Sequence, residues 1–355
     1  MTDFPENLLV EKLPKVTVIM PVRNEADYIE RSLGAVLRQD YPHDKFEVIV
    51  VDGVSADGTH DFVKEMASRF PKNNIRLLNN DKHIFSTGFN IGLSQAGGEV
   101  IIMLGGHTRI AQDYVQHCVK HLGNHGIDCV GGNVETIGET FQSKVIALAM
   151  SSHFGVGGVV FRTGSKRLME VDTVAFGAYK RSAIHRCGPM DEEMVKNQDD
   201  EYNYRLREIG GRIVLAPEIR CRYYSRASLL QLWRQYFQYG YWKVRVMQKH
   251  PRQMRLRHFI PSVFVASIFG SVLLAPFLDL ALILFLLISG CYVSANLFAS
   301  IITSFKKGWN YLPLLPITFA TLHFSYGLGF LVGLVRFFNR WEDRSSPTWA
   351  DISKT

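Results

Sequence analysis

The chain has 355 residues, 47% of them hydrophobic and 21% charged, with a formal net charge of +7 at pH 7. This length suits one large domain or two ordinary ones. The five cysteines form no C-x-x-C pair, which argues against a zinc site or a disulfide framework and suits packing residues. The basic residues do not indicate nucleic-acid binding, because several cluster before a long apolar stretch, where they suit anionic lipid headgroups. They are Lys243, Arg245, Lys249, Arg252, Arg255 and Arg257.

The first 15 residues, MTDFPENLLVEKLPK, are predicted to form an extension ahead of the first domain. They lack the basic start and the apolar core of a secretory signal. We therefore expect the domain that follows, residues 16–228, to be cytoplasmic.

Strand-like and helix-like segments alternate through the first hundred residues. Val16–Met20 is a short β-branched run stopped by Pro21, and it is followed by a segment with apolar residues at helical spacing. The pattern repeats, with strands expected at Phe46–Val51, Ile75–Leu78 and Val100–Leu104 and helices between them. Such alternation predicts an α/β fold with a mainly parallel sheet that helices cover on both faces.

Polar residues follow three of these predicted strands. Ligands of parallel sheets bind at the carboxyl ends of the strands, so we expect the three loops to form one binding site. Neither a G-x-G-x-x-G loop nor a P-loop follows the first strand, so neither NAD binding nor ATP hydrolysis is indicated. The loop residues are Arg23, Asn24, Glu25, Asp52, Ser55, Asp57, Gly58, Gly105, Gly106 and His107.

Two further stretches precede the next helix. FGVGGVVFRTG, residues 154–164, is expected to be a mobile lid, because glycine permits many backbone conformations. VDTVAFGAY, residues 171–179, is predicted to be a strand that carries Asp172.

NQDDEYNYRLR, residues 197–207, opens with the acids Asp199, Asp200 and Glu201. Asn, Gln and Asp suit the start of a helix, the macrodipole favours acids there, and Glu201 lies four residues before Arg205. An inert helix could begin in the same way. Catalytic carboxylates are the alternative interpretation, and the spacing alone does not decide between the two.

Three long stretches near the C-terminus contain no Lys, Arg, Asp or Glu, and each is long enough to cross a bilayer core, which needs ~20 apolar residues. If all three cross, the bases Arg336, Arg340 and Arg344 lie on the side opposite the cytoplasmic domain, against the positive-inside tendency. If the first stretch only dips into the membrane, two crossings return these bases to the cytoplasm. Both topologies stay open. The stretches are Phe259–Leu278, Leu280–Phe305 and Tyr311–Val335.

The preceding residues 229–258 mix aromatic rings with Lys and Arg, which predicts an amphipathic helix lying along the membrane surface. The predicted organisation is therefore a catalytic domain at 16–228, this interface region, membrane segments within 259–338 and a polar tail at 339–355.

Six stretches between residues 16 and 261 resemble, in order, the family 2 glycosyltransferases with a GT-A fold, and among them the succinoglycan-biosynthesis ExoA type. They are VTVIMPVRNEADYIERSL, VVDGVSADGT, GFNIGLSQAGGEVI, VDTVAFGAYKR, NQDDEYNYRLREIGGRIVLAP and LLQLWRQYFQYGYWKV. The resemblance implies an inverting transferase at the inner or plasma membrane. It would move a sugar from a nucleotide sugar, such as a UDP-sugar, to a lipid-linked saccharide in polysaccharide or surface-glycan assembly.

The resemblance also assigns roles to individual residues. Counting back from Arg205 and Leu206, Asp199 matches the general base, with Asp200 as the alternative. Asp172 would border the acceptor, although a buried, capped aspartate fits equally well. The donor site would include Pro21, Asn24, Glu25, Asp52, Gly105 and His107, and the diphosphate and acceptor would meet Arg234, Gln235 and Trp242.

The sequence departs from the family at its metal motif, where Gly105-Gly106-His107 replaces an Asp-x-Asp or Asp-Ala-His triplet. His107 is the side chain of the triplet that is left to bind the expected divalent ion, and imidazole suits Mn²⁺ better than Mg²⁺. A polar loop residue is the other interpretation of His107. The missing acid also permits a donor-binding pseudoenzyme that scaffolds a glycan-assembly complex, and sugar transfer to polyprenyl phosphate is a further alternative.

Overall fold

The computed structural model describes residues 13–71 and 74–352. The chain divides into two compact units that do not follow its order. The first takes in the chain up to Asn133, Ser165–Cys221 and the residues from Ser346 onward. The second consists of Val134–Gly164 and Arg222–Ser345.

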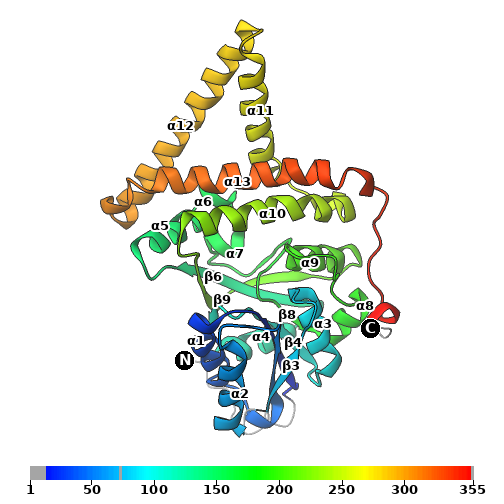
Figure 1. The fold of residues 1–355 in the computed structure, drawn as a ribbon. Helices are drawn as coiled ribbons and strands as arrows, with labels where there is room; N and C mark the ends of the chain where they lie inside the picture. The colour runs from blue at the N-terminus through cyan, green and yellow to red at the C-terminus, as the bar shows by residue number, and fades with distance from the viewer. Residues whose placement is uncertain (1–12, 72–73, 353–355) are drawn as a thin grey trace. The chain divides into compact units, whose positions relative to one another are not determined.

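The described strands form one mixed sheet with the order β3-β2-β1-β4-β8-β6-β9-β5, and β7 pairs with β9 (Figure 1). Strands β1, β2, β3 and β4 pair in parallel, whereas β8 is antiparallel to β4 and β6. The bounds are β1 Val16–Val22, β2 Phe46–Asp52, β3 Ile75–Asn79, β4 Val100–Met103, β5 Thr108–Ile110, β6 Cys129–Ile137, β7 Met169–Glu170, β8 Ala178–Lys180 and β9 Ile213–Tyr224. The predicted α/β fold with a mainly parallel sheet is confirmed in this first half.

The core of the first unit lies on the central parallel strands. Every residue of β1, β2 and β4 is buried, as expected when helices cover both faces of a parallel sheet. The register aligns Val22 with Asp52, so β1 and β2 end at the same edge of the sheet. The helices of this unit are α1 Ala26–Leu37, α2 Thr59–Arg69, α3 Phe85–Gln95, α4 Tyr114–Leu122, α8 Arg181–Cys187, α9 Gln198–Glu208 and α14 Trp349–Ile352, with a 3₁₀ turn at His43–Lys45.

Two strand predictions were wrong in their bounds. The first strand continues through Pro21 to Val22. Proline has no N–H to donate, but none is needed at this position. The nitrogen of Pro21 faces the side of β4, and β4 pairs with β1 only as far as Ile19. The predicted strand at 171–179 is reduced to β8 at its end. Its earlier backbone is held by a side chain instead, since Asn203 Nδ2 donates to the Val174 carbonyl, and Phe176 has a positive φ of 55°.

The second unit is helical apart from its strand ends. Its helices are α5 Phe141–Met150, α6 His153–Val156, α7 Val160–Thr163, α10 Leu229–Lys249, α11 Ile260–Leu274, α12 Asp279–Lys307 and α13 Leu315–Arg336, with 3₁₀ turns at Pro251–Gln253, Leu256–His258, Trp309–Tyr311 and Phe338–Arg340. Residues 154–164, where a mobile lid is predicted, contain most of α6 and all of α7, which Gly157 and Gly158 separate with positive φ angles, and the lid stays a prediction. The predicted amphipathic helix is α10.

Within the described residues, α12 and α13 are long and apolar enough to cross a membrane, and α11 is a shorter apolar helix. Figure 1 shows α13 running alongside α10, whereas α11 and α12 rise from α13 as a hairpin on the face away from α10. Two glycines permit the close packing of α10 and α13. A Cβ at Gly240 would lie 2.0 Å from the Tyr326 carbonyl oxygen, and one at Gly329 would lie 2.0 Å from that of Phe237.

Candidate active site

The loops after β1 and β2 hold each other by hydrogen bonds. The Asn24 N–H donates to Ser55 Oγ at 2.8 Å, and Asn24 Oδ1 accepts from the Ala56 N–H at 3.0 Å. The Glu25 N–H donates to Thr59 Oγ1 at 2.8 Å. The predicted meeting of these two loops at the carboxyl edge of the sheet is therefore present in the structure.

Asp57 ties the second loop to the first turns of α1 and α2. Its Oδ2 accepts from the Ala26 N–H at 3.0 Å, and its Oδ1 accepts from the Thr59 N–H at 3.1 Å and from Thr59 Oγ1 at 2.6 Å. Partial burial alone would raise the pKa of Asp57, but these donors outweigh it and lower the pKa below its ordinary value. Asp57 is thus a charged anchor of the loop.

Asp52, at the end of β2, is 2% exposed, and its carboxylate faces polar groups. Oδ1 accepts from Ser55 Oγ at 2.5 Å, and Oδ2 accepts from the Ser55 N–H at 3.1 Å. His60 Nδ1 lies 3.4 Å from Oδ2. On the neighbouring loop, His83 Nδ1 lies 2.9 Å from the Gly53 carbonyl oxygen and donates to it. Two imidazoles therefore flank this strand end.

The backbone around these side chains is strained. Asn24, Val54 and His83 have positive φ angles of 51°, 56° and 60°, which residues other than glycine rarely adopt. Such conformations persist where surrounding contacts enforce them, and they gather at functional sites. The strain thus coincides with the predicted binding loops.

The loop after β4 brings His107 to Glu25, with 2.8 Å between Nδ1 and Oε1. Gly106 allows this approach, because a Cβ there would lie 2.6 Å from Glu25 Cγ. Gly105 lies beside Phe176, whose ring carbon Cε1 is 3.6 Å from the position of a Cβ. The predicted donor residues Asn24, Glu25 and His107 therefore lie on loops in mutual contact.

These side chains do not make up a metal site of their own. Among the residues that the structure describes, no group of three or more His, Cys, Asp or Glu side chains is placed to hold an ion. The loop supplies one imidazole, which Glu25 engages, whereas Mn²⁺ and Mg²⁺ take several ligands. The predicted metal therefore does not fit a site built from the side chains of the described residues alone.

The acid cluster forms the first turn of α9, as predicted. Asp199 Oδ1 accepts from the Asp200 N–H at 3.0 Å. Thr173 Oγ1 donates to Asp200 Oδ1 at 2.9 Å, and Asn203 Nδ2 donates in turn to Thr173 Oγ1 at 2.9 Å. The segment that contains Thr173 also contains Phe176, which lies against Gly105. It therefore connects the loop after β4 with the start of α9.

The predicted Glu201–Arg205 pair is present, but it is buried rather than superficial. Two bonds of 3.0 Å join the guanidinium Nε and Nη2 to the two carboxylate oxygens. Nη1 donates to the carbonyls of Cys187 and Pro189 at 3.0 and 2.8 Å. Burial alone would lower the pKa of Arg205, but the carboxylate of Glu201 raises it above its usual range. The pair fixes α9 against the loop that follows α8.

The remaining predicted residues fall in different places. Asp172 is buried in the first unit, at 5% exposure. Arg234, Gln235 and Trp242 belong to α10 of the second unit, where Arg234 is exposed. Gln235 Nε2 donates to the hydroxyls of Tyr223 and Tyr239 at 2.9 and 3.0 Å, and Trp242 packs on Phe337. Pro21 lies beside Gly88.

Sequence reasoning missed the polar residues that support the site. Thr173 and Asn203 hold Asp200, and His60 and His83 flank Asp52 and Gly53. Two of these had a usable signal, because His60 falls in the first turn of a predicted helix and His83 follows a predicted strand. Thr173 and Asn203 meet across 30 residues, and no local pattern indicates such a bond.

Residues 17–186 match the sequence model of the family described as Glycosyl transferase family 2. Residues 17–186 therefore form a glycosyltransferase family 2 domain. The transferase is 28% identical to the succinoglycan biosynthesis protein ExoA of Rhizobium meliloti, over 91% of its own chain and 96% of that protein. It is 26% identical to the dolichyl N-acetyl-alpha-D-glucosaminyl phosphate 3-beta-D-2,3-diacetamido-2,3-dideoxy-beta-D-glucuronosyltransferase of Methanococcus voltae, over 90% of its own chain and 97% of that protein.

Among solved structures, the transferase resembles the mannosyltransferase PcManGT from Pyrobaculum calidifontis in complex with GDP-Man and Mn²⁺. The TM-score is 0.60 at 21% identity, covering 90% of this chain and 87% of that one. It also resembles S. aureus TarS in complex with UDP-GlcNAc, with a TM-score of 0.51 at 17% identity and 91% of each chain covered. The predicted GT-A fold and the prediction of a glycosyltransferase are confirmed.

Proposed function

We propose that this transferase moves a sugar, with inversion, from a nucleotide-sugar donor to a lipid-linked saccharide in polysaccharide or surface-glycan assembly. The main support is that the loops containing Asn24, Asp52 and His107 contact one another at one edge of the sheet. The segment that contains Thr173 connects these loops to the acidic first turn of α9. The names of the relatives support the acceptor class, since one refers to succinoglycan biosynthesis and another to a dolichyl-linked sugar phosphate.

The donor would bind at the strand-end loops. Asp52, held by Ser55 and His60, is our proposed contact to the base or ribose, and Pro21, Asn24, Glu25, Gly105 and His107 would border the nucleotide. We expect a UDP-sugar, as in the UDP-GlcNAc complex of TarS. The GDP-Man complex of PcManGT makes a guanine nucleotide the first alternative to test.

We propose Asp199 as the general base. A sugar hydroxyl is a poor nucleophile at neutral pH, and a carboxylate that takes its proton is worth roughly 10²–10⁴ in rate. The hydroxyl oxygen forms the new bond to the anomeric carbon as the bond to the diphosphate breaks, and the nucleotide diphosphate leaves with the electron pair. This single in-line displacement inverts the configuration. Asp200 is the alternative base, but its bond from Thr173 suits a role in positioning the turn.

The departing diphosphate needs positive charge beside it. The exposed Arg234 of α10 is our proposed source, with Gln235, Trp242 and Asp172 near the acceptor. The predicted contact of His107 with Mn²⁺ or Mg²⁺ stays a prediction, which the assay below tests. We further propose that the apolar helices attach the enzyme to the inner or plasma membrane and that residues 16–228 form the catalytic domain on its cytoplasmic side.

The test is a donor screen with the full chain in membranes that contain lipid-linked saccharides. UDP-glucose, UDP-galactose, UDP-GlcNAc and GDP-mannose are supplied in turn, with and without Mn²⁺ or Mg²⁺, and the release of UDP or GDP is followed. We expect acceptor-dependent release with one donor and a product that contains a new glycosidic bond.

Two other outcomes contradict the proposal. A product that contains a sugar phosphate would indicate transfer to polyprenyl phosphate. Tight donor binding without release would indicate a donor-binding scaffold, the alternative that the missing acid at Gly105 favours.

A further inference from the structure

The α11–α12 hairpin of the second unit is apolar and uncovered. Its large side chains are exposed along both helices and across the turn between them: Leu273 in the last turn of α11 is 73% exposed, and Phe277 between the helices is 80% exposed. Asp279 is the one charged residue between Arg257 and Lys306. Only 11% of the most apolar window of α12 is buried within the protein. A surface of this kind is stable when it lies in hydrocarbon.

Helix α13 differs from α12, although both are long and apolar enough to cross a membrane. Of its most apolar window, 44% is buried. One side meets α10 through Gly240, Gly329 and Gly333, and Phe154 of α6 packs edge-to-face on Phe319. The protein therefore already covers much of the surface that a spanning helix would present to lipid.

The partner of α13 carries charge along its length. Helix α10 contains Arg234, Lys243, Arg245 and Lys249, and it contacts α13 from Phe237 beside Gly329 to Gln248 beside Phe337. A helix with four bases does not lie across a bilayer core, where each base costs about 2.5–3.5 kcal/mol. Because α13 runs alongside α10, the two helices share one direction, and α13 cannot cross a bilayer while α10 lies along its surface.

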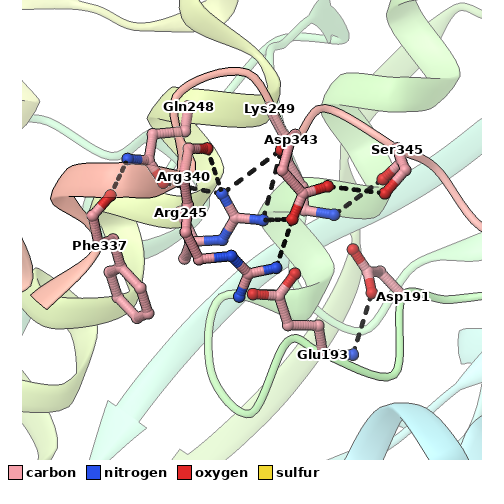
Figure 2. Close-up of polar contacts among 9 residues, drawn as sticks. All are labelled: Asp191, Glu193, Arg245, Gln248, Lys249, Phe337, Arg340, Asp343 and Ser345. Carbon is pink, nitrogen blue, oxygen red and sulfur yellow. Dashed lines mark hydrogen bonds and ion pairs between the residues drawn. The ribbon is translucent and has the colours of Figure 1, made fainter.

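A polar cluster fixes the end of α13 to α10 (Figure 2). Arg245 is fully buried, and its Nη2 lies 3.3 Å from Asp343 Oδ2, which Arg340 also binds. Gln248 Nε2 donates to the Phe337 carbonyl at 2.8 Å. Lys249 Nζ donates to the Ser345 carbonyl at 2.8 Å. The residues that directly follow α13 therefore lie among charged and polar groups of α10.

Both ends of the hairpin carry exposed bases. Arg252 and Arg255 precede α11, and Lys306 and Lys307 end α12. Near a membrane surface each such base adds attraction to anionic headgroups. Lys and Arg are enriched in the cytoplasmic loops of membrane proteins. Bases at both ends of the hairpin therefore favour a hairpin whose two ends lie on the cytoplasmic side.

We infer that, of these helices, the α11–α12 hairpin alone inserts into the bilayer, and that α10 and α13 lie along the membrane surface. Both ends of the hairpin would lie on the same side of the membrane as the proposed catalytic domain. This inference rests on the membrane attachment proposed above. It differs from both topologies that the sequence left open, because each of those requires Tyr311–Val335 to cross. The occupant of the apolar surface is a bilayer with anionic headgroups.

The test is labelling of single cysteines in sealed vesicles that hold the full chain, with a charged thiol reagent added to one side. Lys307→Cys follows α12, Asn339→Cys follows α13, and Lys64→Cys reports the side of the catalytic unit. Each is placed in a Cys291→Ser background, because Cys291 is the exposed native cysteine. We expect all three to label from the same side.

Two labelling patterns overturn the inference. Lys307→Cys on the side of Lys64→Cys, with Asn339→Cys on the other side, would show that α11, α12 and α13 all cross. Lys307→Cys opposite both Lys64→Cys and Asn339→Cys would show that α12 and α13 are the crossing pair.

The unsubstituted chain gives a measurement that does not depend on the folding of a variant. Its Cys291 should resist the reagent in intact vesicles and should label after detergent is added. Labelling of Cys291 before detergent would contradict insertion of α12.

Nucleotide diphosphate release in the same vesicles separates this inference from the proposed function. If all three cysteines label from the same side but no nucleotide diphosphate is released, only the proposed function is contradicted. If nucleotide diphosphate is released but Asn339→Cys labels from the opposite side to Lys64→Cys, only the proposed topology is contradicted.

Discussion

The two ends of the central strands differ in how their acidic side chains are held. At the amino end, Glu47 is 2% exposed and receives donors on every side. Thr17 Oγ1 and the Gly97 N–H donate to it, and Lys15 and Arg76 form ion pairs with it at 3.2 Å. Burial would raise the pKa of Glu47, but these contacts lower it below its ordinary value. This end contains the charge network of a stable core.

At the carboxyl end the acids are also bonded, but the backbone around them is not relaxed. Asn24, Val54 and His83 have positive φ angles, and Phe176 and Asn197 add two more near the acid turn of α9. Strain of this kind weakens a fold and is kept where it places groups for a ligand. The contrast implies that substitutions at the amino end change stability first, whereas those at the carboxyl end change activity first.

The largest stability effect is expected for Glu47→Gln. The substitution leaves Lys15 and Arg76 without a carboxylate and puts the NH₂ group of glutamine against their donors at a buried position, which should destabilise the protein by about 3 kcal/mol while donor affinity stays unchanged. Thermal unfolding and nucleotide titration measure the two effects. The control is Glu65→Gln, whose exposed pair with Arg69 should contribute less than about 1 kcal/mol. Equal losses in both variants would contradict the contrast.

Asp57→Asn should have a smaller effect on stability, about 1–3 kcal/mol. The asparagine can still accept from Thr59, but its NH₂ group would face the Ala26 N–H, a donor against a donor. Because Asp57 joins the two donor loops, we also expect weaker nucleotide binding, measured by titration. If the variant is less stable but binds the nucleotide with unchanged affinity, Asp57 does not contribute to the donor site.

Val54→Gly should raise stability by up to about 1 kcal/mol. A β-branched residue at φ 56° is strained, and Val54 is 51% exposed, so little packing is lost. The matched change is Gly58→Ala at φ 93°, where a Cβ meets nothing within 4 Å, so strain alone should lower stability by about 1 kcal/mol. Thermal unfolding should show opposite signs, and a shared sign would refute the assignment of strain.

The smallest effect is a gradual dependence of stability on pH. The folded pKa of Glu47 is lowered, so its contribution is fully present above the ordinary value of 4.5 and is lost as the pH falls from there toward the folded pKa. Glu47→Gln should therefore flatten the acid limb of a curve of unfolding free energy against pH. An unchanged acid limb would show that Glu47 does not titrate as its contacts indicate.

Local pattern was sufficient to predict the first half of the fold. The buried runs of β1 and β2 and the spacing of α1 and α2 follow from periods that a sequence displays directly. The acid turn of α9 was predicted for the same reason, since its residues are neighbours in the chain.

Features that depend on distant partners could not be predicted. The burial of the Glu201–Arg205 pair depends on carbonyls near α8, and the loss of strand at Val174 depends on Asn203. The hydropathy of α13 resembles that of a spanning helix, and its packing against α10 and α6 distinguishes it from α12. Gly329 and Gly333 do have the G-x-x-x-G spacing of a closely packed helix, but that spacing does not identify the helix against which they pack.

The most direct test of the account is the rate of nucleotide diphosphate release by Asp199→Asn, with Asp200→Asn and the unsubstituted enzyme alongside. We expect Asp199→Asn to lower the rate by about 10²–10⁴ while donor affinity and unfolding temperature stay unchanged, and we expect Asp200→Asn to retain most of the activity. Full transfer by Asp199→Asn, or the larger loss in Asp200→Asn, would contradict the assignment of Asp199 as the base.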